Sequence, residues 1–224
     1  MHRDGAVLFD LDRTLCVGTQ DEDDLLEEAF DRAGVDQFCT IPDLVAVSDD
    51  LPTAESDVEF YELGLRAVAE TRRADPADAP AVARAYADLV DHSAVDFRPG
   101  ARTALEVAGE HYAVGLITNG GEEKQTTKLE TLGIADAFDV QIFADPANGV
   151  QPKPDPEPFS RALSALEVEP EDAVHVGDSL ACDVAGANQF GLTSVWVPFE
   201  DGSRSEGPTP SHVLDTPGDL PTIL

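Results

Sequence analysis

The sequence predicts an α/β fold in which a parallel sheet, covered by helices, is interrupted early by a helical insertion. From residue 97 onward, short apolar runs alternate with helical patterns, which is typical of a parallel sheet with both faces covered. Residues 17–96, by contrast, carry apolar residues at helical spacing and almost no strand signal. The 224 residues suffice for one domain with a large insertion or for two small domains.

The first elements are a buried strand and a series of helices. Residues 6–9 are four consecutive apolar residues, as expected for a strand covered on both faces. A helix over 21–34 begins with acidic residues, which the helix dipole favours, and Gly34 provides its stop. Two further helices are predicted over 53–73 and 79–92.

The alternating half of the chain supplies the rest of the sheet. A strand-helix-strand unit needs only about 30 residues, so the longer interval between Asp10 and Thr118 must contain an insertion. We therefore predict an α/β core of residues 1–16 and 97–224 and a helical insertion of residues 17–96. The remaining predicted elements are a helix after Gly100, a strand at 112–118, a helix at 122–133, a strand at 139–144, a helix after Pro156, a strand at 173–177, a helix at 181–190, a strand at 193–198, a surface loop at 199–210 and a short edge strand at 212–214.

The charge of the chain is strongly negative. There are 45 acidic and 14 basic residues, a net charge of −31, and lysine occurs only at positions 124, 128 and 153. The acids are dispersed rather than gathered in a tail, which argues against disorder and is typical of a halophilic protein adapted to a salt-rich cytoplasm. The acidity also argues against DNA or RNA as a partner, because nucleic acids require basic patches.

Cysteine and hydropathy indicate a reducing compartment. Cys16, Cys39 and Cys182 are odd in number and show no metal-ligand spacing, so we expect free thiols rather than disulfides or zinc. No apolar run approaches the length of a membrane span, and no charged start precedes a long apolar stretch. We therefore expect a cytoplasmic protein without a membrane partner.

Two carboxylates follow the first strand in the pattern Asp10-Leu11-Asp12-Arg13-Thr14. In an open parallel sheet, ligands bind at the carboxyl ends of the strands. A charge at that edge of a core strand requires a partner such as a cation or a hydrogen-bonding ligand. Alone this motif is weak, because acidic residues at i and i+2 also occur in calcium loops and in ordinary acidic loops.

Three later segments strengthen the prediction. A second strand ends in Thr118-Asn119-Gly120, a small hydroxyl followed by a turn. Lys153 lies in the proline-stiffened loop Gln151-Pro152-Lys153-Pro154. A third strand, which contains His175, ends in Gly177-Asp178-Ser179, and Asp183 follows five residues after Asp178.

Nucleophile, hydroxyl, lysine and acidic pair, in this order, resemble the four motifs of the haloacid dehalogenase-like (HAD) hydrolase superfamily, over about residues 6–197. The resemblance implies a Rossmann-like core, a helical cap formed by the insertion, and an aspartyl-enzyme mechanism. It implies that Asp10 is the nucleophile and Asp12 the general acid and base. Dehalogenases of this superfamily lack a carboxylate at the position of Asp12, since a halide leaving group needs no proton.

The resemblance also assigns the remaining site residues. Mg²⁺ would be bound by Asp10, the backbone carbonyl of Asp12, and Asp178, which suits the preference of this ion for carboxylate oxygens. Lys153 would offset the phosphate charge and hold the nucleophile. Thr118 and the backbone N–H groups of Asn119 and Gly120 would bind phosphate, and Asp183 would bind Lys153 or a metal-bound water. Thr14 and Ser179 would be supporting hydroxyls, and His175 a core histidine. Arg13, which replaces the family's usual glycine, receives no role.

The predicted function is a Mg²⁺-dependent phosphatase that acts on a small phosphorylated metabolite. A phosphomutase remains an alternative because the same aspartates serve it. The sequence also leaves open a 2-haloacid dehalogenase and a non-catalytic binding member of the superfamily. It determines neither the substrate nor the oligomeric state.

Overall fold

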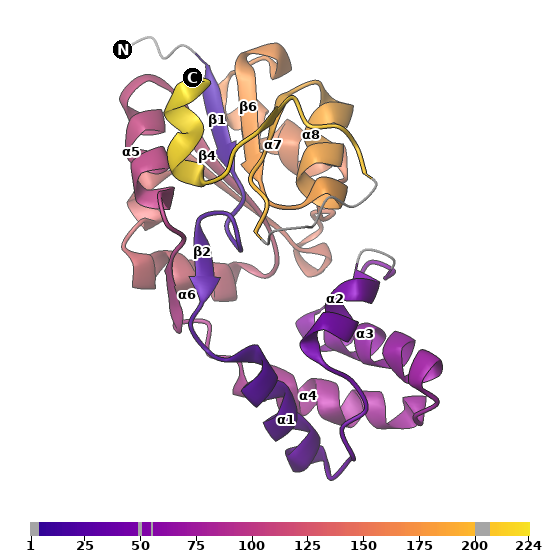
Figure 1. Ribbon diagram of the computed structural model, residues 1–224. Coiled ribbons are helices and arrows are strands. Elements are labelled where there is room, and N and C mark those ends of the chain that lie inside the picture. The colour runs from indigo at the N-terminus through magenta and orange to yellow at the C-terminus, as the bar shows by residue number, and fades with distance from the viewer. Residues whose placement is uncertain (1–4, 49–50, 55, 200–206) are drawn as a thin grey trace. The chain divides into compact units, whose positions relative to one another are not determined.

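The computed structural model describes residues 5–48, 51–54, 56–199 and 207–224. It divides into two compact units (Figure 1). The first, the α/β unit, comprises Met1–Gly18 and Val95–Leu224, and the second, the helical unit, is Thr19–Ala94. Each end of the helical unit therefore lies two residues inside the predicted insertion of residues 17–96.

The α/β unit contains a sheet of six strands in which every neighbouring pair is parallel. The strand order is β5-β4-β1-β6-β7-β8. Strand β1 is central, and its last residue, Phe9, lies opposite Leu116 on one side and Val176 on the other. The strands are β1 (Ala6–Phe9), β4 (Ala113–Asn119), β5 (Val140–Ala144), β6 (Ala173–Gly177), β7 (Thr193–Trp196) and β8 (His212–Val213).

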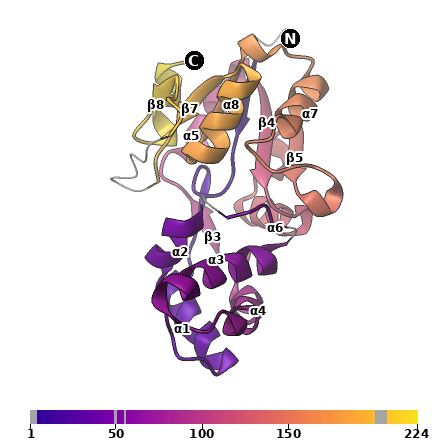
Figure 2. The same cartoon turned by 90° about the vertical axis from the view of Figure 1, so that its right-hand side faces the viewer.

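Helices cover both faces of this sheet, as the alternating pattern predicted (Figures 1 and 2). Side chains alternate along β1, so Val7 and Phe9 join one core, and Ala6 and Leu8 join the other. Both cores are fully shielded from solvent at β1, which explains why this strand reads as an unbroken apolar run. The first core includes α5 (Ala101–His111) and α6 (Glu122–Leu132), and the second includes α7 (Pro156–Leu166) and α8 (Ala185–Phe190).

A two-stranded antiparallel ribbon connects the α/β unit to the insertion. It consists of β2 (Cys16–Gly18) and β3 (Val95–Phe97), with Gly18 opposite Val95. Each strand has only three residues, which is too short for an alternating pattern to stand out in the sequence. The chain leaves and re-enters the sheet region through this ribbon.

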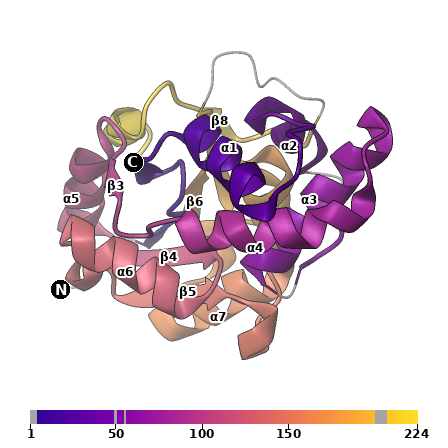
Figure 3. The same ribbon diagram turned by 90° about the horizontal axis from the view of Figure 1, so that it is seen from below.

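The helical unit has its own apolar core, and Figure 3 shows the helices of this unit from below. Helix α1 begins after Asp21, whose carboxylate accepts hydrogen bonds from two backbone N–H groups, and its core side chains include Leu26 and Phe30. Helix α2 was not predicted, because it is short and none of its residues is fully buried. The four helices are α1 (Glu22–Ala33), α2 (Ile41–Ser48), α3 (Asp57–Arg72) and α4 (Ala79–Leu89).

Other elements differ from prediction mainly at their ends. The helix predicted at 181–190 begins with a π-helical turn, Leu180–Val184, and such turns occur frequently at functional sites. The helix predicted at 53–73 begins at Asp57 behind the capping hydroxyl of Ser56. Most of the predicted loop at 199–210 lies outside the described residues. Among the helices that the structure describes, none has the length and apolar character needed to cross a membrane.

Candidate active site

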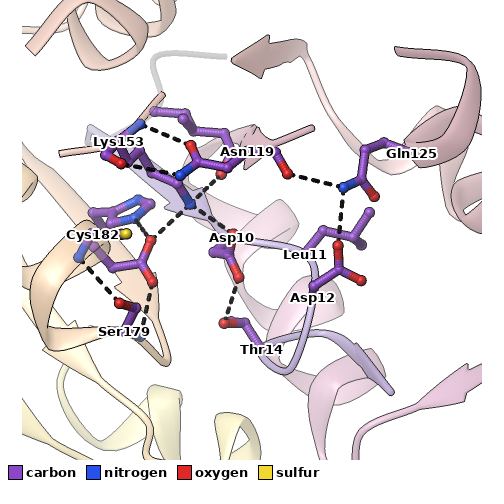
Figure 4. Close-up of polar contacts among 12 residues, drawn as sticks. Asp10, Leu11, Asp12, Thr14, Asn119, Gln125, Lys153, Ser179 and Cys182 are labelled. Atoms are coloured by element: carbon purple, nitrogen blue, oxygen red, sulfur yellow. Dashed lines mark hydrogen bonds and ion pairs between the residues drawn. The ribbon is translucent and has the colours of Figure 1, made fainter. Parts of the chain in front are cut away.

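Asp10 stands at the carboxyl end of the central strand. Its backbone N–H donates to the carbonyl of Val176 at 2.9 Å, so the pairing of β1 with β6 continues through this residue. The side chain is almost completely buried. One carboxylate oxygen accepts from the Thr14 hydroxyl at 2.9 Å, and the other accepts from Lys153 (Figure 4). The sequence motif therefore places a buried carboxylate with fixed orientation at the sheet edge.

Lys153 links the nucleophile candidate to the second acidic motif. Its Nζ donates to Asp10 Oδ1 at 2.6 Å, to Asp183 Oδ1 at 2.7 Å and to the carbonyl of Ile117 at 2.8 Å. These three bonds use every N–H of the ammonium group. Burial alone would lower the pKa of Lys153, but the attraction of Asp10 and Asp183 outweighs it and raises the pKa. The lysine is therefore a fixed positive charge.

Asn119 holds the loop that carries this lysine. Its amide oxygen accepts from the Lys153 backbone N–H at 2.8 Å, and its amide nitrogen donates to the Lys153 carbonyl at 3.1 Å. Thr118 is buried beside it at the end of β4. The Gly120 N–H, predicted to bind phosphate, instead donates to the carbonyl of Ala144 at 3.2 Å. Phosphate binding by Thr118, Asn119 and Gly120 stays a prediction.

Asp183 is held in place by donors on both oxygens. Oδ1 accepts from Lys153, and it lies 2.9 Å from Nε2 of His175. Oδ2 accepts from the backbone N–H of Ser179 at 3.0 Å. The Ser179 hydroxyl accepts from the Cys182 N–H, so its role in this structure is to cap the helical turn.

Asp10, Asp178 and Asp183 form a group of carboxylates that could hold a metal ion, with ligand atoms within 4.8 Å of one another. Burial raises the pKa of Asp10 from 3.8 to about 6, against the opposing effect of Lys153. Burial, reinforced by the charges of Asp10 and Asp183, raises the pKa of Asp178 from 3.8 to about 8. Burial would also raise the pKa of Asp183, but Lys153 and His175 together lower it. Lys153 contacts Asp10 and Asp183. Among the described residues, no cation is recorded in direct contact with Asp178, the third carboxylate of the group.

His175 serves this group from the core side of β6. It is buried, and burial lowers its pKa despite the opposing hydrogen bond to Asp183. With a proton on Nε2, the imidazole donates to the Asp183 carboxylate. The histidine is therefore a core residue that also orients Asp183.

Gly177 leaves the space that Asp183 occupies. A Cβ added at residue 177 would lie 2.1 Å from Cγ of Asp183, and that carboxylate cannot move without breaking its buried bonds. We expect Gly177→Ala to lower the free energy of unfolding by about 3 kcal/mol and to abolish catalysis. Gly109→Ala is the matched control, because a Cβ there meets nothing within 4 Å and alanine favours the helix. Denaturant titrations in high salt measure the free energy of unfolding of the two variants. Equal losses of stability in Gly177→Ala and Gly109→Ala would contradict the prediction.

Asp12 lies apart from the three clustered carboxylates. Figure 4 shows its side chain turned toward Gln125 and away from Lys153. Lys128 Nζ contacts both Asp12 oxygens, at 2.7 and 2.8 Å, and Gln125 Nε2 donates to Oδ2 at 2.9 Å. The sequence analysis assigned no role to Gln125 or Lys128. The one signal in the sequence was their spacing of three residues, which places both on one face of the helix after Thr118.

Arg13 adopts a left-handed backbone conformation, with φ of 61°. That conformation explains why glycine is the usual residue at this position of the motif. The Arg13 guanidinium lies over the ring of Phe199, 5.6 Å from its centroid. Arg98, which the sequence analysis did not single out, is buried and donates to the carbonyls of Arg13 and Val197 at 2.7 and 2.9 Å. Arg98 thereby fastens the loop after β1 to the end of β7.

Comparisons with known proteins identify the family of this chain. The family described as haloacid dehalogenase-like hydrolase matches residues 5–191. A glyceraldehyde 3-phosphate phosphatase of Pyrococcus furiosus is 41% identical over 102 residues, which span 45% of this chain and 42% of that relative. A ribulose-1,5-bisphosphate 5-phosphatase of Halopiger xanaduensis is 30% identical over an alignment of 240 positions, which covers 98% of each chain. The crystal structure of a HAD phosphatase from Thermococcus onnurineus superposes with a TM-score of 0.67 at 25% identity, and covers 98% of this chain and 97% of that one.

The parallel sheet and the family match over residues 5–191 define a hydrolase of the α/β class. This chain belongs to the haloacid dehalogenase-like hydrolase family.

Proposed function

We propose that this protein is a Mg²⁺-dependent phosphatase that hydrolyses a small phosphorylated metabolite through an aspartyl-phosphate. The observation that carries the proposal is the pair of separately held carboxylates in the first motif. Asp10 is buried against Lys153, whereas Asp12 is half exposed and is held by donors from another element. A dehalogenase would have no use for the second carboxylate, because its leaving group is not protonated.

The two carboxylates divide the reaction between them. An oxygen of Asp10 attacks phosphorus, the bond from phosphorus to the ester oxygen breaks, and Asp12 gives its proton to the leaving oxygen. Asp12 then takes a proton from a water molecule, which attacks the aspartyl-phosphate and releases inorganic phosphate. Lys153 holds Asp10 in place for both steps.

The residues present fit Mg²⁺. Three carboxylates converge, and Lys153 is the cation that directly contacts two of them. Mg²⁺ prefers one or two carboxylates together with water and phosphate oxygens. Asp10 and Asp178 would hold the ion with the backbone carbonyl of Asp12, whereas Asp183 is already engaged by Lys153 and His175. When bound, the ion supplies the positive charge that brings an anionic phosphate to this acidic edge.

Mg²⁺ binding should release a proton at neutral pH. With its pKa raised to about 8, Asp178 is mostly protonated at pH 7 without metal, and Mg²⁺ requires the carboxylate. Because the folded-state pKa lies above the unfolded value, this group destabilises the metal-free fold as pH rises from about 4 to 8. Calorimetric titrations at pH 7 in two buffers of different ionisation enthalpy measure the proton release, which should be largely absent at pH 9. Asp178→Asn should weaken Mg²⁺ binding by about tenfold or more and remove the release, whereas binding heats independent of buffer would contradict the assignment.

The helical unit is proposed to act as the cap that selects the substrate, a role typical of insertions that exclude water from a site. The substrate class is a small phosphate ester, as the names of the two phosphatase relatives suggest. The proposed location is the cytoplasm, and neither a nucleic acid nor a membrane is proposed as a partner.

The proposal is tested by release of inorganic phosphate from a panel of phosphometabolites, with Mg²⁺ or with EDTA, in about molar KCl. The panel includes glyceraldehyde 3-phosphate and ribulose 1,5-bisphosphate, the substrates in the relatives' names. Mg²⁺-dependent release supports the proposal, and the ranking of substrates identifies the physiological class. No release from folded protein would overturn it, and transfer between sugar phosphates would indicate a phosphomutase instead.

A further inference from the structure

We propose that Gln125 and Lys128 are positioning residues that aim the carboxylate of Asp12 for its work as general acid and base. The inference rests on the proposed phosphatase function, because it concerns the same reaction. It adds residues of helix α6 to the two aspartates of the first motif as parts of the proposed site.

Both oxygens of the Asp12 carboxylate are engaged by helix α6. Lys128 bonds to both oxygens of Asp12, and Gln125 bonds to one of them. The Asp12 side chain is 46% exposed, so water alone could have satisfied it. Two donors from one helix instead fix both the position and the rotation of the carboxylate plane, and proton transfer depends on such alignment.

The chain has three lysines, and two of them contact the two aspartates of the first motif, Lys153 with Asp10 and Lys128 with Asp12. The Lys128 side chain is only 13% exposed. A shielded contact pair withstands molar salt, in which the Debye length is about 3 Å and open surface pairs are screened. Two of the three lysines thus lie where a positive charge can act in high salt.

Gln125 leaves one of its own polar atoms unsatisfied where it contacts Asp12. Its Nε2 donates to Asp12 and to the carbonyl of Asn119, at 2.9 and 3.2 Å. Its Oε1 is buried and has no hydrogen-bond partner among the described residues. An unsatisfied buried acceptor typically costs about 1–3 kcal/mol. Stability alone does not explain an amide placed in this way.

Gly120 makes the approach of Gln125 possible. Its φ of 135° is accessible to glycine but rarely to other residues, and an added Cβ would lie 2.8 Å from Gln125 Nε2. The turn after β4 therefore shapes the support of Asp12, in addition to any contact with phosphate.

The test compares leaving groups. Departure of p-nitrophenolate needs little protonation, whereas departure of an alkoxide needs the general acid. We expect Lys128→Met to lower kcat/KM by about 10- to 100-fold for the best alkyl phosphate of the panel and by less than about threefold for p-nitrophenyl phosphate. Gln125→Glu, which keeps the shape and removes the donors, should show the same pattern if the lysine variant fails to fold. Lys128→Arg should restore part of the alkyl phosphate activity.

Two controls separate positioning from a structural role. Lys124→Met removes the same charge one turn earlier on α6 and should leave both substrates unaffected. In an Asp12→Asn background, Lys128→Met should cause no further loss, because the residue that it positions is gone. An equal loss in both backgrounds, an equal loss for both leaving groups, or a change confined to KM would overturn the inference. If the unsubstituted enzyme releases no phosphate at all, the proposed function fails and this inference fails with it, whereas an active enzyme with the wrong pattern refutes the inference alone.

Discussion

Replacement of Asp10 by asparagine is expected to abolish phosphate release, with a fall in kcat of about 10⁴-fold or more. Asp10 is the buried carboxylate at the end of the central strand, and Lys153 and Thr14 hold its two oxygens. An amide in that place cannot form the acyl-phosphate. The measurement is phosphate release under saturating substrate and Mg²⁺ in high salt.

Acid-quenched enzyme shows directly whether phosphate becomes bound to the protein. Asp12→Asn is the matched variant, since it changes one carboxylate to an amide two residues away and spares the nucleophile. With p-nitrophenyl phosphate it should accumulate phosphorylated protein, because the step that needs a base is slowed. Asp10→Asn should give none. Retained turnover in Asp10→Asn would remove the covalent mechanism.

Transfer into low salt is expected to unfold the helical unit before the α/β unit. Residues 19–94 contain 20 acidic residues and five arginines, a net charge of −15 over 76 residues. The other 148 residues carry −16, so the charge density of the helical unit is about twice as high. Six acids on α1 are all exposed and are accompanied by a single arginine. At about 10 mM salt the Debye length reaches roughly 30 Å, and this repulsion acts almost unscreened.

Hydrogen exchange followed by mass spectrometry, over a series of KCl concentrations from about 2 M down to about 10 mM with EDTA throughout, resolves the two units. Peptides from 19–94 should lose protection at a higher salt concentration than those from the sheet strands. The double substitution Glu27→Gln and Asp31→Asn, which removes two exposed charges of α1, should move that transition to lower salt. Circular dichroism and exchange unchanged between the two salts would refute both the order and the salt dependence.

Much of the fold could be predicted because the signals are local. The unbroken apolar run of β1 and the strand-helix alternation after residue 97 identified the parallel sheet correctly. The helical insertion was predicted from the long interval between Asp10 and Thr118 and from the helical spacing of apolar residues within it. What was missed has a physical reason: β2 and β3 have three residues each, and α2 buries no side chain completely.

The site shows where sequence reasoning ends. The motif residues could be found because acids and a lysine stand at strand ends and in a stiff loop. The partners of Asp12 could not, because Gln125 and Lys128 lie more than 100 positions away and their pattern is that of any polar helix face. The sequence suggested no link between Gly120 and Asp12, yet the missing side chain of Gly120 makes room for Gln125, which contacts Asp12.

The ribbon of β2 and β3 has an implication for how such an enzyme can diversify. Gly18 and Val95 are paired neighbours, and the Thr19 N–H donates to the Ala94 carbonyl at 2.8 Å, so the insertion begins and ends at one point. Segments whose ends already meet can be exchanged between genes with little loop-closure cost, and the recipient sheet keeps its register. Recombination at this junction would exchange the proposed cap while the residues at the sheet edge stay unchanged, so that the two parts can be inherited separately.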